Sequence, residues 1–232
     1  MSRMKTPNRR RSSAVWRGSP QGWLDGAYDL LITSGIDSVK ILALARRLKL
    51  SRTSFYWFFR DRDSLLAALL ERWRSRNTDS LVRQADQYAE TITEAVLAVF
   101  DCWFDSKLFD ARFEFAVRSW AQQSPKVAAE LKVADELRLN ALKQMFIRFH
   151  VDPRAADVRA RSLYLTQIGY ISLKSEEPLA VRMGRIAHYC NIFSGKNPSK
   201  SELNRFFARH YFSSSDIESQ QLKKNEPSEV LN

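Results

Sequence analysis

The sequence predicts an all-α protein with a core large enough for one or two domains. Apolar residues recur at spacings of three and four along most of the 232 residues, the periodicity of a helix with one buried face. Only seven glycines and seven prolines interrupt the chain, and the alternation typical of strands is hard to find. Hydrophobic residues make up 44% of the chain, so its core needs neither disulfides nor a structural metal.

Three short helices are predicted first. The first covers residues 23–34 and ends before Gly35, a residue suited to a left-handed helix stop. The second reaches to about Leu48, and the third follows Ser51, whose hydroxyl can cap its N-terminus, and runs to Phe59. The apolar faces of the first two helices comprise Trp23, Ala27, Leu30 and Leu31, and Ile41, Leu44, Ala45 and Leu48.

The rest of the chain continues as helices with recognisable starts. Asp61 can cap a helix that extends to about Ala85. Ser199 and Glu202 have the spacing of a capping box and start a last short helix. The helices between them are expected at residues 90–105, 109–122, 126–150, 154–174 and 178–193.

Positive charge is concentrated at the start of the chain. The 37 basic and 26 acidic residues leave a formal net charge of +11. Residues 1–60 hold twelve of the basic residues and only three of the acidic ones, so most of the excess lies there. This asymmetry indicates a surface for a polyanion. Nucleic acid is the usual one, and an anionic membrane surface is the alternative that composition leaves open.

We divide the chain into four parts. Residues 1–19, with six basic residues and no acidic one, are expected to form a basic disordered arm. Residues 20–62 form the three-helix domain, residues 63–212 a larger helical domain, and residues 213–232 a flexible tail. The arm either contacts phosphates and the minor groove of DNA or is a solvated tail that adds only nonspecific affinity.

Composition and spacing argue against an enzyme and against an integral membrane protein. Cys102 and Cys190 lie 88 positions apart, and the three histidines lack the spacing of metal ligands. Neither a glycine-rich phosphate loop nor a catalytic triad can be identified. No apolar run approaches the roughly 18 residues of a membrane span, and no signal peptide is evident. We therefore expect no catalysis, cofactor or metal, and a cytoplasmic, nucleoid-associated protein.

The second and third helices have the dimensions of a helix-turn-helix, whose second helix lies in the major groove of DNA. If Phe55 and Phe59 face inward, the rotation of the helix turns the residues between them toward solvent. The alternative is that the two aromatic residues Tyr56 and Trp57 pack against the next helix. The side chains expected to point outward are Arg52, Thr53, Tyr56 and Trp57.

The stretch Leu44–Leu66 closely resembles the DNA-binding signature of the TetR family of transcriptional regulators. The likeness lies in the order of an alanine-containing helix, a serine cap, a threonine, a tyrosine, a phenylalanine and a basic residue before two leucines. It covers roughly residues 20–75, about a quarter of the chain. The resemblance implies DNA contacts through Lys40, Ser51, Arg52, Thr53, Ser54, Tyr56, Trp57 and Arg62.

The resemblance implies different roles for these residues. Arg52 and Thr53 would read base edges, the arginine favouring guanine. Ser54, Tyr56 and Arg62 would hold phosphate oxygens, which fixes the register of the protein on DNA rather than its sequence preference.

Three positions depart from the family pattern. Lys49 replaces the turn glycine, so its backbone either adopts a left-handed conformation at some cost or forms another turn. Lys40 stands where the family commonly has a serine or threonine cap, which leaves Asp37 or Ser38 to cap the second helix and the lysine to contact a phosphate. Phe58 replaces a residue that is often histidine or tyrosine, and we expect it in the core.

Large aromatic residues are frequent between residues 81 and 149. They form either a plain core or, as in proteins of this family, a cavity for a small effector. No charged residue can be assigned to such a cavity from the sequence, so we expect an apolar or aromatic effector, whose identity the sequence does not give. The candidate lining residues are Phe100, Trp103, Phe104, Phe113, Trp120, Phe146 and Tyr164.

The segments 154–174 and 178–193 lie where TetR-like proteins form a four-helix bundle between two subunits, and a bundle within one chain is the alternative. The expected dimer interface comprises Leu163, Gln167, Ile168, Ile171, Ile186, Tyr189 and Phe193. A twofold dimer sets two recognition helices about one DNA turn apart, roughly 34–36 Å, and therefore requires a palindromic operator.

The sequence thus predicts a sequence-specific DNA-binding transcriptional regulator, taken as a repressor. A bound effector would change the separation of the two recognition helices and release the double-stranded operator. The alternative is a TetR-like interaction factor whose C-terminal domain binds a protein partner. A cavity of roughly a few hundred Å³ in the second domain would favour the effector, and a filled core the protein partner.

Overall fold

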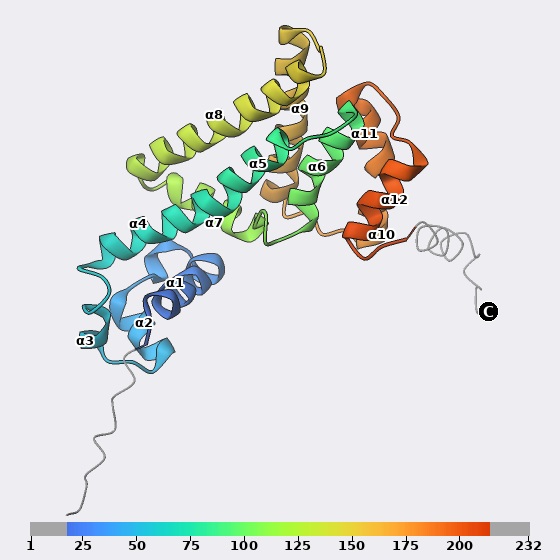
Figure 1. Ribbon diagram of the computed structural model, residues 1–232. Coiled ribbons are helices and arrows are strands. Elements are labelled where there is room, and N and C mark those ends of the chain that lie inside the picture. The colour runs from blue at the N-terminus through green and yellow to red at the C-terminus, as the bar shows by residue number, and fades with distance from the viewer. Residues whose placement is uncertain (1–17, 214–232) are drawn as a thin grey trace, which may run out of the picture.

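The computed structural model describes residues 18–213, and every regular element in that part of the chain is helical. Figure 1 shows a smaller N-terminal lobe and a larger lobe that a long helix connects. The helices are α1 (Pro20–Ser34), η1 (Ile36–Ser38), α2 (Ile41–Leu48), α3 (Arg52–Phe55), α4 (Arg62–Trp73), η2 (Arg74–Asp79), α5 (Ser80–Asp86), α6 (Ile92–Phe104), α7 (Ala111–Ala121), α8 (Pro125–Arg148), α9 (Pro153–Ser172), α10 (Leu179–Gly184), α11 (Ile186–Ser194) and α12 (Lys200–Arg209).

Local capping chemistry starts several helices where the sequence predicts. Asp61 and Ser64 form a reciprocal capping box at the start of α4, and Ser199 and Glu202 form another at the start of α12. The N-terminal N–H groups of a helix have no partner within the helix, so these side chains supply one. Gly195 ends α11 in a left-handed conformation, with φ 74° and ψ 11°.

The connecting helix is continuous from α4 through η2 into α5, which confirms the helix predicted between Asp61 and about Ala85. Its middle, η2, is π-helical. The side chains of Asn77 and Thr78 are completely buried in this stretch. A π-helical segment often marks a functional position inside a longer helix, and here it carries polar groups into the interface between the lobes.

The apolar core of the N-terminal lobe continues into the larger lobe. Its buried cluster contains Trp23 and Phe55 from the three-helix region and Phe113, Trp120 and Val127 from α7 and α8. The packing therefore crosses the expected boundary after residue 62, and the two lobes share apolar surface.

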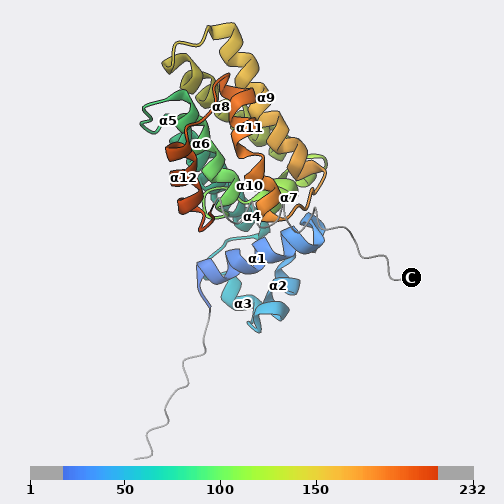
Figure 2. The same cartoon turned by 90° about the vertical axis from the view of Figure 1, so that its right-hand side faces the viewer.

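In the larger lobe, α8 and α9 pack together as a helical hairpin, and α6 lies against α5, α11 and α12. Figure 2 shows α9 and α11 side by side on the face turned to the viewer. A second buried cluster, centred on α6, α9 and α11, fills this lobe. Within residues 18–213, no helix combines the length and the apolar character that crossing a membrane would require.

One predicted helix is shorter than expected, and another is divided in two. Helix α3 ends at Phe55, and the chain continues as turns in which the Phe59 N–H donates to the Phe55 carbonyl at 3.0 Å. The helix expected at 178–193 is divided into α10 and α11 at Arg185.

The predicted cap of α2 is wrong. The Ser38 hydroxyl donates to the carbonyls of Leu30 and Gly35 at 3.1 and 2.6 Å, and Asp37 lies within η1. Lys40 occupies the N-cap position without a side-chain cap. Most of the predicted basic arm and nearly all of the predicted tail lie outside the described residues.

Glu202 joins α12 to the start of α6. Its carboxylate accepts hydrogen bonds from the hydroxyls of Thr91 and Thr93, the latter at 2.7 Å, and from the Ser199 backbone N–H. Burial by itself would raise the pKa of Glu202. The hydrogen bonds to the carboxylate outweigh this effect and lower the pKa from its ordinary value of 4.5 to about 2. The ionised carboxylate is therefore the form that the folded protein stabilises.

The depressed pKa predicts an acid-dependent loss of stability. The contribution of Glu202 is fully present above the unfolded pKa of 4.5 and is lost as pH falls toward 2. Urea unfolding at a series of pH values is expected to show this loss in the unaltered protein and a smaller one in Glu202→Gln. The exposed carboxylate change Glu136→Gln is the control. Equal acid sensitivity of both variants would contradict this role for Glu202.

Candidate nucleic-acid interface

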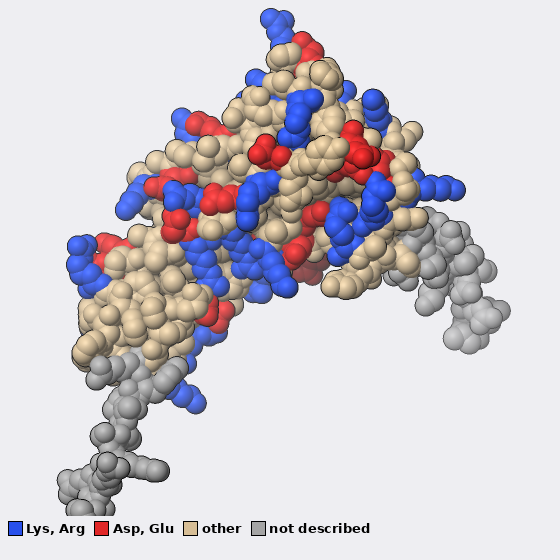
Figure 3. Space-filling model, in the orientation of Figure 1, with Lys and Arg blue, Asp and Glu red and all other residues tan. Residues whose placement is uncertain are grey.

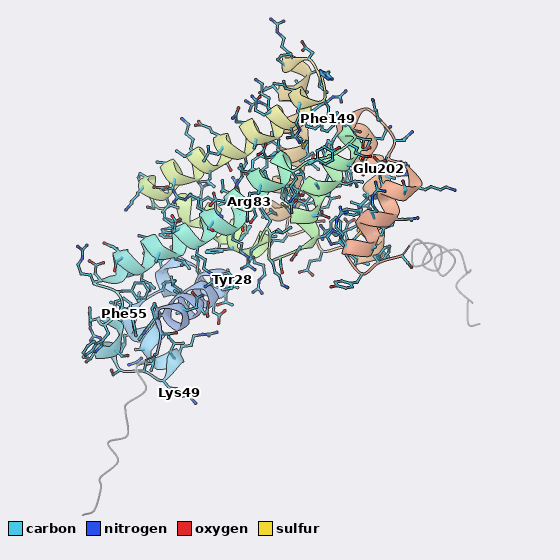
Figure 4. The ribbon with its side chains drawn as sticks, viewed as in Figure 1. Tyr28, Lys49, Phe55, Arg83, Phe149 and Glu202 are labelled. Carbon is cyan, nitrogen blue, oxygen red and sulfur yellow. The ribbon has the colours of Figure 1, made fainter. Side chains whose placement is uncertain are left out.

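A tight turn joins α2 to α3. Lys49 adopts the left-handed conformation, with φ 57° and ψ 38°. The next N–H, of Leu50, donates to the Ala45 carbonyl at 2.9 Å and closes the end of α2. Of the two alternatives for this departure from the family pattern, the left-handed one is present, at a cost of about 1–2 kcal/mol for a residue with a side chain. Lys49 projects from the lower tip of the lobe in Figure 4, where Figure 3 shows a protruding basic side chain.

The inner face of α3 is aromatic. Phe55 is completely buried, and its ring centroid lies 5.2 Å from that of Trp23 and 5.5 Å from that of Phe59. The Ser51 hydroxyl caps the helix by accepting the Ser54 N–H at 3.2 Å. The cap and the aromatic packing together hold α3 in one orientation on α1 and α2.

The outer face of the same segment is exposed. Arg52 and Thr53 are exposed at the start of α3. Tyr56 and Trp57 are 52% and 63% exposed, so they are not core residues of this chain. The expected division, with Phe55 inward and these four side chains outward, is confirmed.

Exposed positive charge surrounds this face. Arg47, in the last turn of α2, pairs with Asp29 of α1 at 3.2 Å. Within residues 18–213, no ion pair involves the four other basic residues of the motif, which are Lys40, Arg46, Lys49 and Arg52. Their charge is therefore available to an anionic partner.

Two of these exposed basic residues are not among the residues that the sequence singled out as candidate DNA contacts. Arg46 in the last turn of α2 and Lys49 in the left-handed turn are both exposed next to α3. Both residues lie at the turn of the helix-turn-helix in the sequence, and that position could have marked them as exposed residues next to α3.

Two predicted phosphate contacts have structural roles. Ser54, expected to hold a phosphate oxygen, is only 4% exposed, and its hydroxyl donates to the Ser51 carbonyl at 2.7 Å. Arg62 is half-buried and donates to the carbonyls of Val39 and Ile36 at 2.6 and 3.0 Å. It thereby ties α4 to the connection between α1 and α2.

Behind the interface, a buried polar network joins the connecting helix to the larger lobe. Its centre is the ion pair of Glu114 on α7 and Arg138 on α8, at 2.8 Å between Oε1 and Nη1, with both side chains completely buried. Trp73 and Asn77 of the connecting helix donate to the other Glu114 oxygen at 2.8 and 2.9 Å. Arg138 also donates to the hydroxyl of Tyr164 on α9, at 2.8 Å. The network thus links four helical segments.

The charges in this network depend on each other. Burial alone raises the pKa of Glu114, but the adjacent Arg138 and Arg118 hold it below its ordinary value. Burial raises the pKa of the Tyr164 hydroxyl, which donates to Asp135 at 2.6 Å. Each group is therefore held in one protonation state at neutral pH.

The candidate effector pocket divides into two groups. Phe100, Trp103 and Phe104 line one cavity in the larger lobe. The other four candidates, which are Phe113, Trp120, Phe146 and Tyr164, do not line it.

These four corrections have separate physical reasons. Phe113 packs edge-on against Tyr28, with centroids 5.1 Å apart, and Trp120 belongs to the same N-terminal cluster. Phe146 is completely buried in the core of the larger lobe. Tyr164 serves the polar network.

Four of the seven residues predicted for the dimer interface do not fit an exposed contact surface. Leu163, Ile171, Ile186 and Phe193 are all buried within their own chain. Gln167 and Tyr189 line the cavity, and Ile168 is partly buried against the core. The regular apolar pattern of α9 and α11 marks the face that packs inward, and the opposite face carries the exposed apolar residues Val158, Leu165 and Ile192.

Similarity to known proteins agrees with this arrangement. Residues 24–69 match the family model of bacterial regulatory proteins of the tetR family. A class A tetracycline repressor protein from Escherichia coli is 30% identical over 130 residues, which cover 53% of this chain and 56% of that protein. An HTH-type transcriptional repressor of Mycobacterium tuberculosis is 32% identical over 71 residues, 31% of this chain and 27% of that protein. The chain thus spans about half or less of these curated relatives.

The fold as a whole has a solved counterpart. A protein from Mesorhizobium loti assigned to the TetR family has a TM-score of 0.52 over 82% of this chain and 95% of its own, at 12% identity. This likeness concerns the fold alone. Within residues 18–213, no cluster of three or more histidine, cysteine, aspartate or glutamate side chains could hold a metal ion. Residues 24–69 thus carry an N-terminal domain that matches the tetR family of bacterial regulatory proteins, and the chain shares its overall fold with a solved protein assigned to that family.

Proposed function

We propose that this protein is a sequence-specific transcriptional regulator, acting as a repressor, that binds operator DNA through α3. The observation that carries the proposal is the two-sided character of α3 and its turn. Phe55 and Phe59 anchor one side in the core, while Arg52, Tyr56 and Trp57 are exposed on the other. A short, capped helix with a rigid back and a basic, aromatic front suits the major groove.

The exposed residues divide by the part of DNA that each can reach. Arg52 and Thr53 stand at the first positions of α3, where a side chain meets base edges and an arginine can bond guanine through two N–H groups. Lys40, Lys49 and Tyr56 flank them and suit phosphate oxygens. The salt dependence of binding would then report the lysines, and the sequence preference would report Arg52.

A homodimer would present two such faces to a palindromic operator. Val158 and Leu165 are seven positions apart on the exposed face of α9, and Ile192 is exposed on the adjacent α11. A Cβ at Gly169 would meet nothing within 4 Å, so a second helix can approach α9 closely there. We propose this face, in place of the buried residues, as the surface of a four-helix bundle between subunits.

The larger lobe supports an effector more than a protein partner. It contains a cavity lined by aromatic residues from α6, α9 and α11. A hollow of about 400 Å³ adjoins it, which is within the range of small-molecule sites. Effector binding would then favour a conformation with a different separation of the two α3 helices and release the DNA.

Selection from a random pool of DNA duplexes tests the function directly. The unaltered protein is expected to enrich a palindrome. Arg52→Ala is expected to lower affinity for that palindrome about tenfold to a hundredfold and to relax the preference at one base of each half-site. Gel-shift titration measures both effects. Arg205→Ala, on α12 of the larger lobe, is the matched control and should bind normally. A folded dimer that enriches no sequence at modest salt would refute the proposal.

A further inference from the structure

The aromatic cavity of the larger lobe is small and mostly apolar. It measures about 50 Å³ and is lined by Phe100, Trp103 and Phe104 from α6 together with residues of α9, α10 and α11. Tyr189 and Phe193 stack on one wall, with ring centroids 5.9 Å apart. Such walls favour an apolar group without hydrogen-bonding atoms.

A wider hollow opens beside this cavity. It measures about 400 Å³, and Trp103, Gln167, Tyr170 and Arg182 line both spaces. The hollow has three basic residues and one acidic residue among its lining side chains, namely Arg112, Lys174, Arg182 and Glu176. One molecule could therefore extend from an apolar end in the cavity to a negatively charged end in the hollow.

Arg182 stands where the two spaces meet. Its Nη2 donates to the Trp103 carbonyl at 3.3 Å, and its guanidinium carbon lies 4.5 Å from the centre of the Phe104 ring. In the described part of the chain, no carboxylate forms an ion pair with it. The neighbouring Arg185 differs, because Glu177 pairs with it at 2.6 Å.

The environment of Arg182 is unfavourable for its charge. Burial lowers the pKa of its guanidinium more than Tyr170 and Glu177 raise it. A half-buried cation with one hydrogen bond to a carbonyl retains several N–H donors for a ligand. A carboxylate would supply the missing countercharge, and its planar shape matches the guanidinium fork.

We propose that the effector is a hydrophobic carboxylate, whose acid group pairs with Arg182 and whose apolar body enters the aromatic cavity. The inference rests on the proposed function, because it names the class of effector for that site. Ile32 of α1 also lines the hollow. A carboxylate bound at Arg182 therefore lies next to both lobes, where it can affect their relative position.

Matched acids and amides test the charge requirement. Isothermal titration of the full-length protein at neutral pH would compare 3-phenylpropanoate and octanoate with the corresponding amides. At least one acid is expected to bind at least about tenfold more tightly than its amide, because the hydrogen bond to the cation is charge-assisted. Binding of both amides as tightly as the acids, or no binding of either acid, would overturn the proposal. The acid that binds more tightly shows whether the site prefers an aromatic or an alkyl group on the ligand.

Two arginine variants locate the site. Arg182→Gln is expected to remove the preference for acid over amide, whereas Arg185→Gln, also at the cavity but already neutralised by Glu177, should keep it. An acid preference that survives in Arg182→Gln would overturn the assignment. If Arg182→Gln does not fold, the acid–amide comparison on the unaltered protein decides the ligand class.

A parallel DNA measurement separates the two proposals. If the acid binds through Arg182 but the protein selects no DNA, the result supports the carboxylate site and refutes the proposed regulatory function. If the protein binds its operator and only neutral compounds release the DNA, the result supports the regulatory function and refutes the carboxylate proposal.

Discussion

Replacing Glu114 by alanine is expected to lower the free energy of unfolding by about 3–5 kcal/mol, because it leaves a charge buried without its partner. Arg138 is completely buried and pairs with Glu114 at 2.8 Å. The change would also leave Trp73 and Asn77 of the connecting helix without the acceptor they share. The loss thus combines a buried cation that keeps only its longer ion pair with Asp135, at 3.6 Å, with two donors deprived of a partner.

Urea denaturation of the purified protein measures this effect. Glu136→Ala removes an exposed carboxylate that lies 3.9 Å from Lys132, and it should change stability by less than about 1 kcal/mol. The double change Glu114→Leu with Arg138→Met is expected to recover part of the loss, because it removes both charges together. A small cost for Glu114→Ala would contradict the view that this pair anchors the connecting helix to the larger lobe.

The same pair predicts a direction with pH. Because the pKa of Glu114 is held below its ordinary value, its stabilising contribution is present above the unfolded pKa and declines as pH falls through the folded one. Glu114→Gln, which keeps the shape of the side chain, should lack the pH-dependent stabilisation by the Glu114 carboxylate at every pH.

Introducing a charge at Leu165 is expected to dissociate the proposed dimer. Leu165 is 56% exposed in the single chain, in line with Val158 on α9 and close to the open space at Gly169. A twofold interface would bury two copies of the aspartate in Leu165→Asp without partners, so the dimer dissociation constant should rise on the order of a hundredfold or more.

Sedimentation at several protein concentrations measures this change. Val133→Asp, an equally exposed apolar position on α8, should leave the association unchanged. Operator affinity is expected to fall with the dimer, because a monomer engages one half-site. If Leu165→Asp sediments as the unaltered protein does, the dimer, if present, uses another face.

Several features follow from neighbouring residues alone. Ser51, Asp61 and Ser199 begin helices because their side chains bond N–H groups two or three positions ahead. The outward position of Tyr56 relative to Phe55 follows from helical rotation over one residue. Such signals act over a few positions and are legible before the chain folds.

Other features depend on contacts between distant segments. Apolar spacing predicted that α9 and α11 each have a buried face, but it could not say whether that face meets its own chain or a second copy. Phe113 and Trp120 look like pocket residues in the sequence, and packing against α1 and α4 places them elsewhere.

The sequence by itself determined the helical class, most helix starts, the likeness of the N-terminal domain to the TetR family and the two-sided character of α3, because each depends on short-range spacing. Only the tertiary structure decided the Glu114–Arg138 network, the side of α9 left exposed and the position of Arg182 between two spaces. These depend on which helices meet, and that is set by the packing of the whole chain.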